Sequence, residues 1–178
     1  MNNQGITIII ADGDCELVAK QLLANTSRVD IKIVDKVTDG ESAIESIRKY
    51  QPDVVLLDIC LPVMDGLGVM ETIRDSGDCP ETLFVVITSV GSQRLIRCAF
   101  DLGASFYVLK PYNSDQLVAR LKQMHERKQE ILAEMSADLI CIPNKSMTDN
   151  VANNIDSDVT DIIRDIGIPA NIKGYQYI

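Results

Sequence analysis

The feature that most constrains the fold is an alternation, repeated five times, of short apolar runs with segments of helical spacing. Strands are expected at 6–11, 31–37, 54–58, 83–88 and 105–109, and helices after Asp14 and at about 40–50, 66–75, 92–102 and 113–135. Apolar runs of this length suit buried strands, whereas the longer amphipathic segments suit helices. Strands that alternate with helices form right-handed crossovers, so the pattern predicts a parallel sheet covered on both faces.

Polar side chains stand at the ends of the expected strands. Asp12 and Asp14 follow the first strand and Asp58 follows the third. Thr88 ends the fourth strand, and Lys110 follows the fifth. In a flavodoxin-like, doubly wound five-stranded sheet of order 2-1-3-4-5 with five helices, the ends of strands one, three and five surround one crevice. We therefore expect an α/β fold that gathers these side chains at one edge of the sheet.

Length, charge and cysteine content limit the classes to which this protein can belong. The 178 residues hold one domain and a modest extra segment, and 26 acidic against 17 basic residues give a formal charge of -9, which disfavours direct binding of nucleic acid. The five cysteines include no Cys-x-x-Cys pair, so neither a zinc ribbon nor a disulfide framework is indicated. Since no apolar stretch approaches the roughly 20 residues of a membrane span, we expect a soluble, cytoplasmic protein without membrane contact.

The segment around Asp58 carries a recognisable pattern. The residues that form it are Asp58, Pro62, Asp65, Gly66, Thr88 and Lys110. Over about residues 6–125 the chain resembles the receiver domains of two-component response regulators. The resemblance implies that Asp58 accepts a phosphoryl group from a histidine on another protein, which is a phosphotransferase or a histidine kinase. It also implies that the protein is not an enzyme, beyond promoting phosphoryl transfer to its own aspartate.

Phosphorylation of a carboxylate requires positive charge, because the transition state spreads negative charge over the phosphoryl oxygens. Asp12, Asp14 and Asp58 are candidate ligands for a divalent cation, for which Mg²⁺ is expected and Ca²⁺ or Mn²⁺ are alternatives. By resemblance, the backbone carbonyl of Cys60 is a further ligand. Gly13 stands where most receivers carry a second adjacent acid, so either Asp14 turns inward to replace it or metal binding is lost.

The resemblance also assigns roles at the fourth and fifth strands. Lys110 would contact the phosphoryl oxygens, aimed by a cis peptide bond to Pro111. Thr88 would hydrogen-bond the phosphoryl group, and Tyr107 would turn inward as Thr88 moves, so both are expected switch residues. Phosphorylation would then bias the face formed by the fourth helix, fifth strand and fifth helix.

The last residues suggest a narrower resemblance. The stretch 155–177, with its Gly-Ile-Pro-Ala-Asn-Ile-Lys-Gly-Tyr sequence, is similar to the opening of the effector domain in the stage 0 sporulation protein A family. The expected division is a receiver domain over 1–128, a helix end and flexible linker over 129–155, and the truncated start of a helical effector domain over 156–178. The resemblance implies a phosphorylation-dependent homodimer that regulates transcription of sporulation genes, with DNA binding only through a complete effector domain.

Two other functions stay open. In the first, Gly13 has abolished metal binding, and the chain is a pseudo-receiver that only dimerises. In the second, Asp12 and Asp14 are the nucleophile and general acid of a haloacid-dehalogenase-like phosphatase. Glu16 stands where that family carries Thr or Val, and the paired late acids are missing. The single histidine, His125, is expected at the surface or an interface without a catalytic part.

Overall fold

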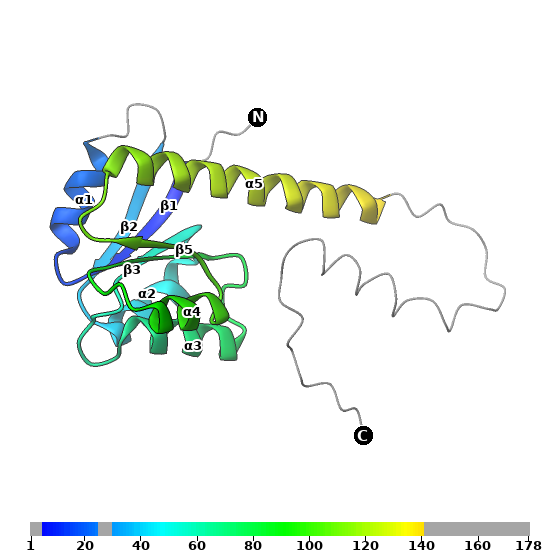
Figure 1. Ribbon diagram of the computed structural model, residues 1–178. Coiled ribbons are helices and arrows are strands. Elements are labelled where there is room, and N and C mark those ends of the chain that lie inside the picture. The colour runs from blue at the N-terminus through cyan, green and yellow to red at the C-terminus, as the bar shows by residue number, and fades with distance from the viewer. Residues whose placement is uncertain (1–4, 25–29, 141–178) are drawn as a thin grey trace, which may run out of the picture. The chain divides into compact units, whose positions relative to one another are not determined.

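The computed structural model describes residues 5–24 and 30–140, and Figure 1 shows its strands and helices in regular alternation. The elements are β1 (Ile6–Ala11), α1 (Cys15–Leu23), β2 (Ile31–Val37), α2 (Gly40–Tyr50), β3 (Val54–Leu57), α3 (Gly66–Ser76), β4 (Leu83–Thr88), α4 (Gln93–Asp101), β5 (Ala104–Leu109) and α5 (Ser114–Ile140). By internal packing the chain divides into Met1–Ala137 and Asp138–Ile178. The predicted order of elements is confirmed.

The five strands form one parallel sheet of order β2-β1-β3-β4-β5. Leu56 lies between Ile10 of β1 and Val85 of β4 in the register of the sheet. Because every neighbouring pair is parallel, the carboxyl ends of all five strands lie at one edge. This is the predicted flavodoxin-like, doubly wound arrangement.

Side chains that alternate along the strands divide the core into two apolar layers. In β1, Ile8 and Ile10 contribute to the layer under α1 and α5, whereas Ile9 and Ala11 contribute to the layer under α2, α3 and α4. Figure 1 shows the two sets of helices on opposite faces of the sheet. Since both faces are covered, the central strands can be apolar throughout, as β3 is.

The observed boundaries differ from the predicted ones in two places that matter. β3 ends at Leu57, so Asp58 is the first residue after the strand. α5 continues to Ile140, beyond the predicted end at residue 135. Ser and Asp at 136–138 indicated a linker, but strong helix formers precede them and the first Pro comes only at 143, so nothing ends the helix sooner. The predicted remainder of the linker and the effector fragment at 156–178 lie outside the described residues.

Two helices begin at aspartate caps. The carboxylate of Asp39 accepts hydrogen bonds from the backbone N–H and the hydroxyl of Ser42 at the start of α2. Asp65 accepts from the N–H of Gly68 at the start of α3.

Within the part of the chain that is described, no helix is both long and apolar enough to cross a bilayer.

Candidate functional site

Three side chains that follow three different strands meet at the carboxyl edge of the sheet. The Lys110 ammonium lies 2.6 Å from Asp12 Oδ2 and 2.7 Å from Asp58 Oδ2. Asp12 is 3 % exposed and Asp58 is 8 % exposed, so both carboxylates are buried. The structure therefore brings together two predicted acidic residues and the predicted lysine.

Backbone hydrogen bonds that extend the sheet by one residue hold this arrangement. The N–H of Asp58 donates to the carbonyl of Ala11 at 2.8 Å, just past the last residue of β3. The N–H of Asp12 donates to Val37, and the N–H of Lys110 donates to Thr88. Each site residue is thus fixed to the neighbouring strand and not carried on a free loop.

The two carboxylates are held in the same way. Asp12 Oδ1 accepts from the N–H of Asp14 at 2.9 Å, and Asp58 Oδ1 accepts from the N–H of Cys60 at 3.0 Å. In both residues the other oxygen, Oδ2, contacts Lys110. Each carboxylate is therefore oriented by a local turn on one side and by the shared ammonium on the other.

Burial and ion pairing have opposite effects on the pKa values of Asp58 and Lys110. Burial alone would raise the pKa of Asp58, but hydrogen bonds from Lys110, the Cys60 amide and Thr88 outweigh it and lower that pKa. Burial alone would lower the pKa of Lys110, but Asp12 and Asp58 raise it. Both shifts favour the charged forms, so Asp58 is a carboxylate and Lys110 an ammonium near neutral pH.

The predicted switch residues both contact one loop residue, Val90. Thr88 is fully buried, and its hydroxyl accepts a long hydrogen bond of 3.4 Å from the N–H of Val90. The Tyr107 hydroxyl donates to the carbonyl of Val90 at 2.6 Å. Thr88 and Tyr107 are therefore connected through the loop between β4 and α4.

Asp14 is placed differently from the other two predicted acidic ligands. It is exposed and occupies the N-cap position of α1, where its side chain makes no capping hydrogen bond. Among residues 5–24 and 30–140, no three acidic, cysteine or histidine side chains come together in a way that could hold a metal ion. The roles of Asp14 and of the Cys60 carbonyl as ligands stay predictions.

The side chains that do converge still suit a hard divalent cation. Asp12 lines a cavity of about 210 Å³ together with Asp14, Lys110 and Tyr112. Asp58 does not line this cavity, but it contacts the same ammonium as Asp12 does. Mg²⁺ is commonly held by one or two carboxylates and keeps several of its waters. Two buried carboxylates that share one ammonium, with a cavity beside Asp12, therefore fit such an ion.

The sequence only weakly indicates two features of the site, the cis peptide bond before Pro111 and the buried hydroxyl of Tyr112. The peptide bond between Lys110 and Pro111 is cis, as the resemblance implied. The hydroxyl of Tyr112 is buried without a hydrogen-bond partner among the described residues, and burial raises its pKa, with Asp12 adding to the effect. An aromatic residue after Lys-Pro gives no sequence indication that its hydroxyl is buried beside the acidic residues.

His125, which was expected at the surface or at an interface, is partly buried. Its side chain is only 15 % exposed, and its Nδ1 lies 3.9 Å from Asp53 Oδ1. Asp53 precedes β3, whereas Asp58 follows it, so the histidine lies at the opposite edge of the sheet from the site. The helical spacing of apolar residues did not reveal this position, because the side chains that α5 buries extend beyond its apolar residues.

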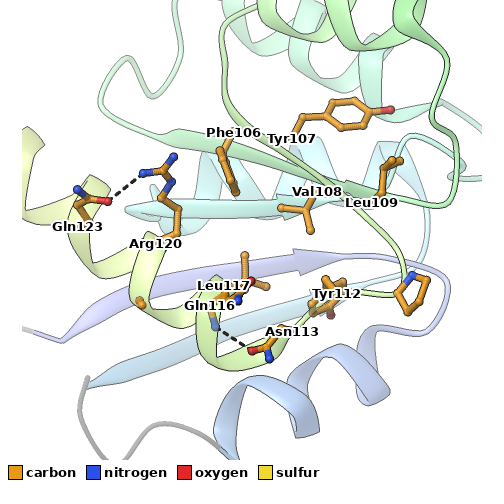
Figure 2. A pocket seen from close by; sticks show the side chains of 12 residues that line it. Phe106, Tyr107, Val108, Leu109, Tyr112, Asn113, Gln116, Leu117, Arg120 and Gln123 are labelled. Carbon is orange, nitrogen blue, oxygen red and sulfur yellow. Dashed lines mark hydrogen bonds between the residues drawn. The ribbon is translucent and has the colours of Figure 1, made fainter.

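A second cavity is separate from the acidic site. It has a volume of about 660 Å³ and lies along β5 and the first half of α5. Figure 2 shows Phe106 and Arg120 facing each other across its rim, with the Arg120 guanidinium 4.7 Å from the ring centre. Neither Asp12 nor Asp58 lines it.

Comparison with known proteins agrees with the geometry. The sequence model of the response regulator receiver domain matches residues 8–122. A DNA-binding response regulator of the LuxR family from Staphylococcus aureus is 26 % identical, with a TM-score of 0.61 over 67 % of this chain and 98 % of that chain.

Two further structures share the fold. The signal receiver domain of the response regulator NarL from Mycobacterium tuberculosis is 24 % identical, with a TM-score of 0.62 over 69 % of this chain and 98 % of that one. The CheX-CheY-BeF3-Mg complex from Borrelia burgdorferi also matches at 24 % identity, with a TM-score of 0.60 over 67 % of this chain and 88 % of that one. From these matches, the sheet order and the side chains gathered at its carboxyl edge, we conclude that the chain belongs to the response regulator receiver domain family.

Proposed function

We propose that the chain accepts a phosphoryl group on Asp58 in a two-component phosphorelay. The observation that carries the proposal is the contact of one lysine with two buried carboxylates at the carboxyl edge of the sheet. An oxygen of Asp58 attacks phosphorus as the bond between phosphorus and the donor nitrogen breaks. The departing imidazole keeps the electron pair of that bond and takes up a proton.

Each neighbouring side chain has a part in this reaction. The Lys110 ammonium, 2.7 Å from Asp58, offsets charge on the phosphoryl oxygens. The Thr88 hydroxyl donates to the bound phosphoryl group and draws Val90 with it, while Tyr107 follows through its own bond to Val90. Asp12 and Asp58 hold the divalent cation, for which Mg²⁺ is proposed, and a bound cation supplies further neutralisation of the phosphoryl charge.

The phosphodonor acts from another molecule. The chain has a single histidine, His125, and it lies beside Asp53 at the far edge of the sheet from Asp58. A phosphotransferase or a histidine kinase is therefore the proposed partner. The protein then has no turnover of its own beyond transfer to, and loss from, its own aspartate.

Intact-mass spectrometry after incubation with acetyl phosphate and Mg²⁺ tests the proposal. We expect one added phosphate on the wild type, none on Asp58→Asn, and normal addition on the matched control Asp101→Asn, which changes an exposed aspartate on α4. A wild-type chain that stays unmodified would overturn the proposal.

The sequence of 155–177 supports a finer proposal. Its similarity to the stage 0 sporulation protein A family suggests a cytoplasmic regulator of sporulation transcription. Phosphorylation would promote a homodimer, and DNA would be bound by a complete effector domain only. Sedimentation with and without acetyl phosphate tests the dimer, and Asp58→Asn should stay in the unphosphorylated state under both conditions.

One observation favours a second candidate. Because only two carboxylates of the described residues contact Lys110, the chain could be a pseudo-receiver that dimerises independently of phosphorylation. This function predicts the same oligomer with and without phosphodonor and no response to Mg²⁺. The hypothesis of a haloacid-dehalogenase-like phosphatase has no such support, because the chain belongs to the receiver domain family.

A further inference from the structure

We infer that a cavity at the edge of the sheet where the strands begin binds a divalent transition-metal ion such as Zn²⁺, with His125 and Asp53 as its ligands. This edge is opposite the one that carries Asp58, so the inference goes beyond the proposed function and does not depend on it. An ion bound there would join α5 to the start of β3.

The cavity has a volume of about 480 Å³ and is separate from the acidic site. Apart from Gly5, every residue that lines it has a polar group in its side chain: Thr7, Tyr50, Gln51, Asp53, His125 and Gln129. An apolar ligand would bury these groups without giving them partners. The cavity therefore suits a polar or charged ligand.

The Nδ1 atom of His125 is buried and has no hydrogen-bond partner among the described residues. Asp53 Oδ1 lies 3.9 Å away, which is too far for a direct hydrogen bond. A buried polar atom that lacks a partner is costly, so the folded chain gains free energy from a group that binds between these two atoms.

Hydrogen bonds to Thr7 orient the Asp53 carboxylate toward the histidine. Asp53 Oδ2 accepts from the N–H of Thr7 at 2.8 Å and from its hydroxyl at 2.6 Å, and the N–H of Asp53 donates to the same hydroxyl at 3.0 Å. Oδ1 is the oxygen that faces His125. Lys128, which lies close by on α5, pairs with Glu81 and not with Asp53. The structure thus presents a negatively charged oxygen opposite an imidazole nitrogen.

An imidazole nitrogen and a carboxylate oxygen are ligands that zinc accepts, whereas Mg²⁺ prefers oxygen ligands alone. In a tetrahedral zinc site with bonds of about 2.0–2.2 Å, two ligand atoms lie about 3.4 Å apart. The observed 3.9 Å is about 0.5 Å wider, which a small rotation of the two side chains would close. The pair is therefore arranged for an ion of this class.

Water molecules would complete the coordination, because the described residues offer no third imidazole, thiolate or carboxylate at this place. Gln129 follows His125 by four residues on α5, so the two lie on the same face of the helix, and both line the cavity. The Gln129 amide can accept a hydrogen bond from a water that is bound to the metal. With two protein ligands, the site should bind zinc less tightly than sites with three or four do.

NMR of the ¹⁵N-labelled full chain during titration with ZnCl₂ measures binding directly, because His125 is the only histidine and gives a single imidazole signal. The Cys60→Ser background removes an exposed thiol that could also bind zinc. We expect a saturable shift of the His125 Nδ1 resonance with ZnCl₂ and none with MgCl₂. An equal shift with MgCl₂ would overturn the inference, and so would a resonance that does not move at millimolar ZnCl₂.

Three variants in the same background test the ligands. Asp53→Asn should weaken zinc binding by about tenfold or more, and Gln129→Ala should weaken it by a smaller factor. Glu130→Gln is the matched control, because it removes an exposed carboxylate from α5 and should leave the affinity unchanged. Equal affinity in Asp53→Asn and the background chain would overturn the inference, since the imidazole would then bind zinc alone.

The fold of Asp53→Asn is checked by circular dichroism, because Asp53 also bonds to Thr7. If that variant does not fold, Gln129→Ala decides, since it leaves the bonds between Asp53 and Thr7 in place, and an unchanged affinity there would overturn the inference. Thermal melting gives a second readout: ZnCl₂ should raise the melting temperature of the background chain more than that of His125→Ala. An equal rise in both would show that zinc binds elsewhere.

Discussion

Gly66, the first residue of α3, lies directly against the backbone carbonyl of Asp58. A Cβ at residue 66 would stand 2.4 Å from that carbonyl oxygen, which is closer than unbonded atoms can approach. The N–H of Gly66 donates to the carbonyl of Ile59 at 3.0 Å, so α3 begins against the backbone of the acceptor segment. A side chain at this position would have to displace the backbone that positions Asp58.

Gly66→Ala is therefore expected to disturb both stability and the site. Overpacking against backbone should lower the free energy of unfolding by about 1–3 kcal/mol. It should also lower the yield of Asp58 phosphate under conditions where the variant is folded. Gly68→Ala is the matched control, because its Cβ would meet side chains and no backbone, with Met64 Cγ at 3.0 Å and Asp65 Oδ1 at 3.4 Å. Equal unfolding midpoints in urea for the two variants would contradict the close-approach argument.

The sequence predicts the fold well because two of its patterns are strong: the short apolar runs and their alternation with helical segments. Short apolar runs such as 54–57 form strands whose side chains are buried on both faces of the sheet, so helices must cover both faces. The alternation of these strands with helices limits the sheet to a few strand orders. The end of α5 was less predictable. Helix formers continue past residue 135 without a glycine or proline, and Ser136 weakens a helix without ending it.

For the site, the sequence predicts which side chains meet but not how they share charge. Asp12, Asp58 and Lys110 follow strand ends, and parallel topology alone brings them to one edge. Sequence spacing cannot show that one ammonium contacts both carboxylates or that Asp14 stays exposed. These details depend on how the loop turns at Gly13, where a glycine permits several backbone conformations.

Removal of the shared ammonium should leave two buried carboxylates unpaired. In metal-free buffer, Lys110→Met is expected to lower the free energy of unfolding by about 2 kcal/mol, which is less than for a fully buried pair because the lysine is 24 % exposed. The double variant with Asp58→Asn should be less destabilised than the sum of its single variants predicts, with a coupling of about 1 kcal/mol. Urea unfolding of all four proteins measures that coupling, and strict additivity would show that the pair of Lys110 with Asp58 contributes nothing to stability.

The cap of α2 should make stability depend on pH in the acidic range. Hydrogen bonds from the backbone N–H and hydroxyl of Ser42 lower the pKa of Asp39. A group whose pKa is lower in the folded state stabilises that state above its unfolded pKa, about 3.9 for Asp, and the contribution is lost as pH falls below it. Asp39→Asn keeps a capping oxygen that does not titrate.

The urea midpoint of the wild type, relative to that of Asp39→Asn, should therefore fall as pH is lowered from about 6 to about 3. Asp101→Asn, measured in parallel, supplies the control for removal of an exposed carboxylate. A wild-type midpoint that stays level with that of Asp39→Asn over this range would show that the cap does not depend on charge.

Val63 carries backbone strain in the loop that follows the acceptor. Its φ is 68°, which is unfavourable for a β-branched residue, and its side chain is 76 % exposed, so it gains little from burial. The N–H of Met64 donates to the carbonyl of Pro62 across it, at 2.8 Å, in a tight three-residue turn. The turn therefore fixes a conformation that valine disfavours.

Val63→Asn should raise the free energy of unfolding by about 1 kcal/mol, since asparagine adopts positive φ more readily. Val63→Gly should gain less, because glycine also gives the unfolded chain more freedom. Val63→Ala keeps a Cβ at positive φ and serves as the control for loss of the exposed methyl groups. Urea unfolding compares the series, and an asparagine variant no more stable than the alanine variant would show that the strain is relieved elsewhere in the loop.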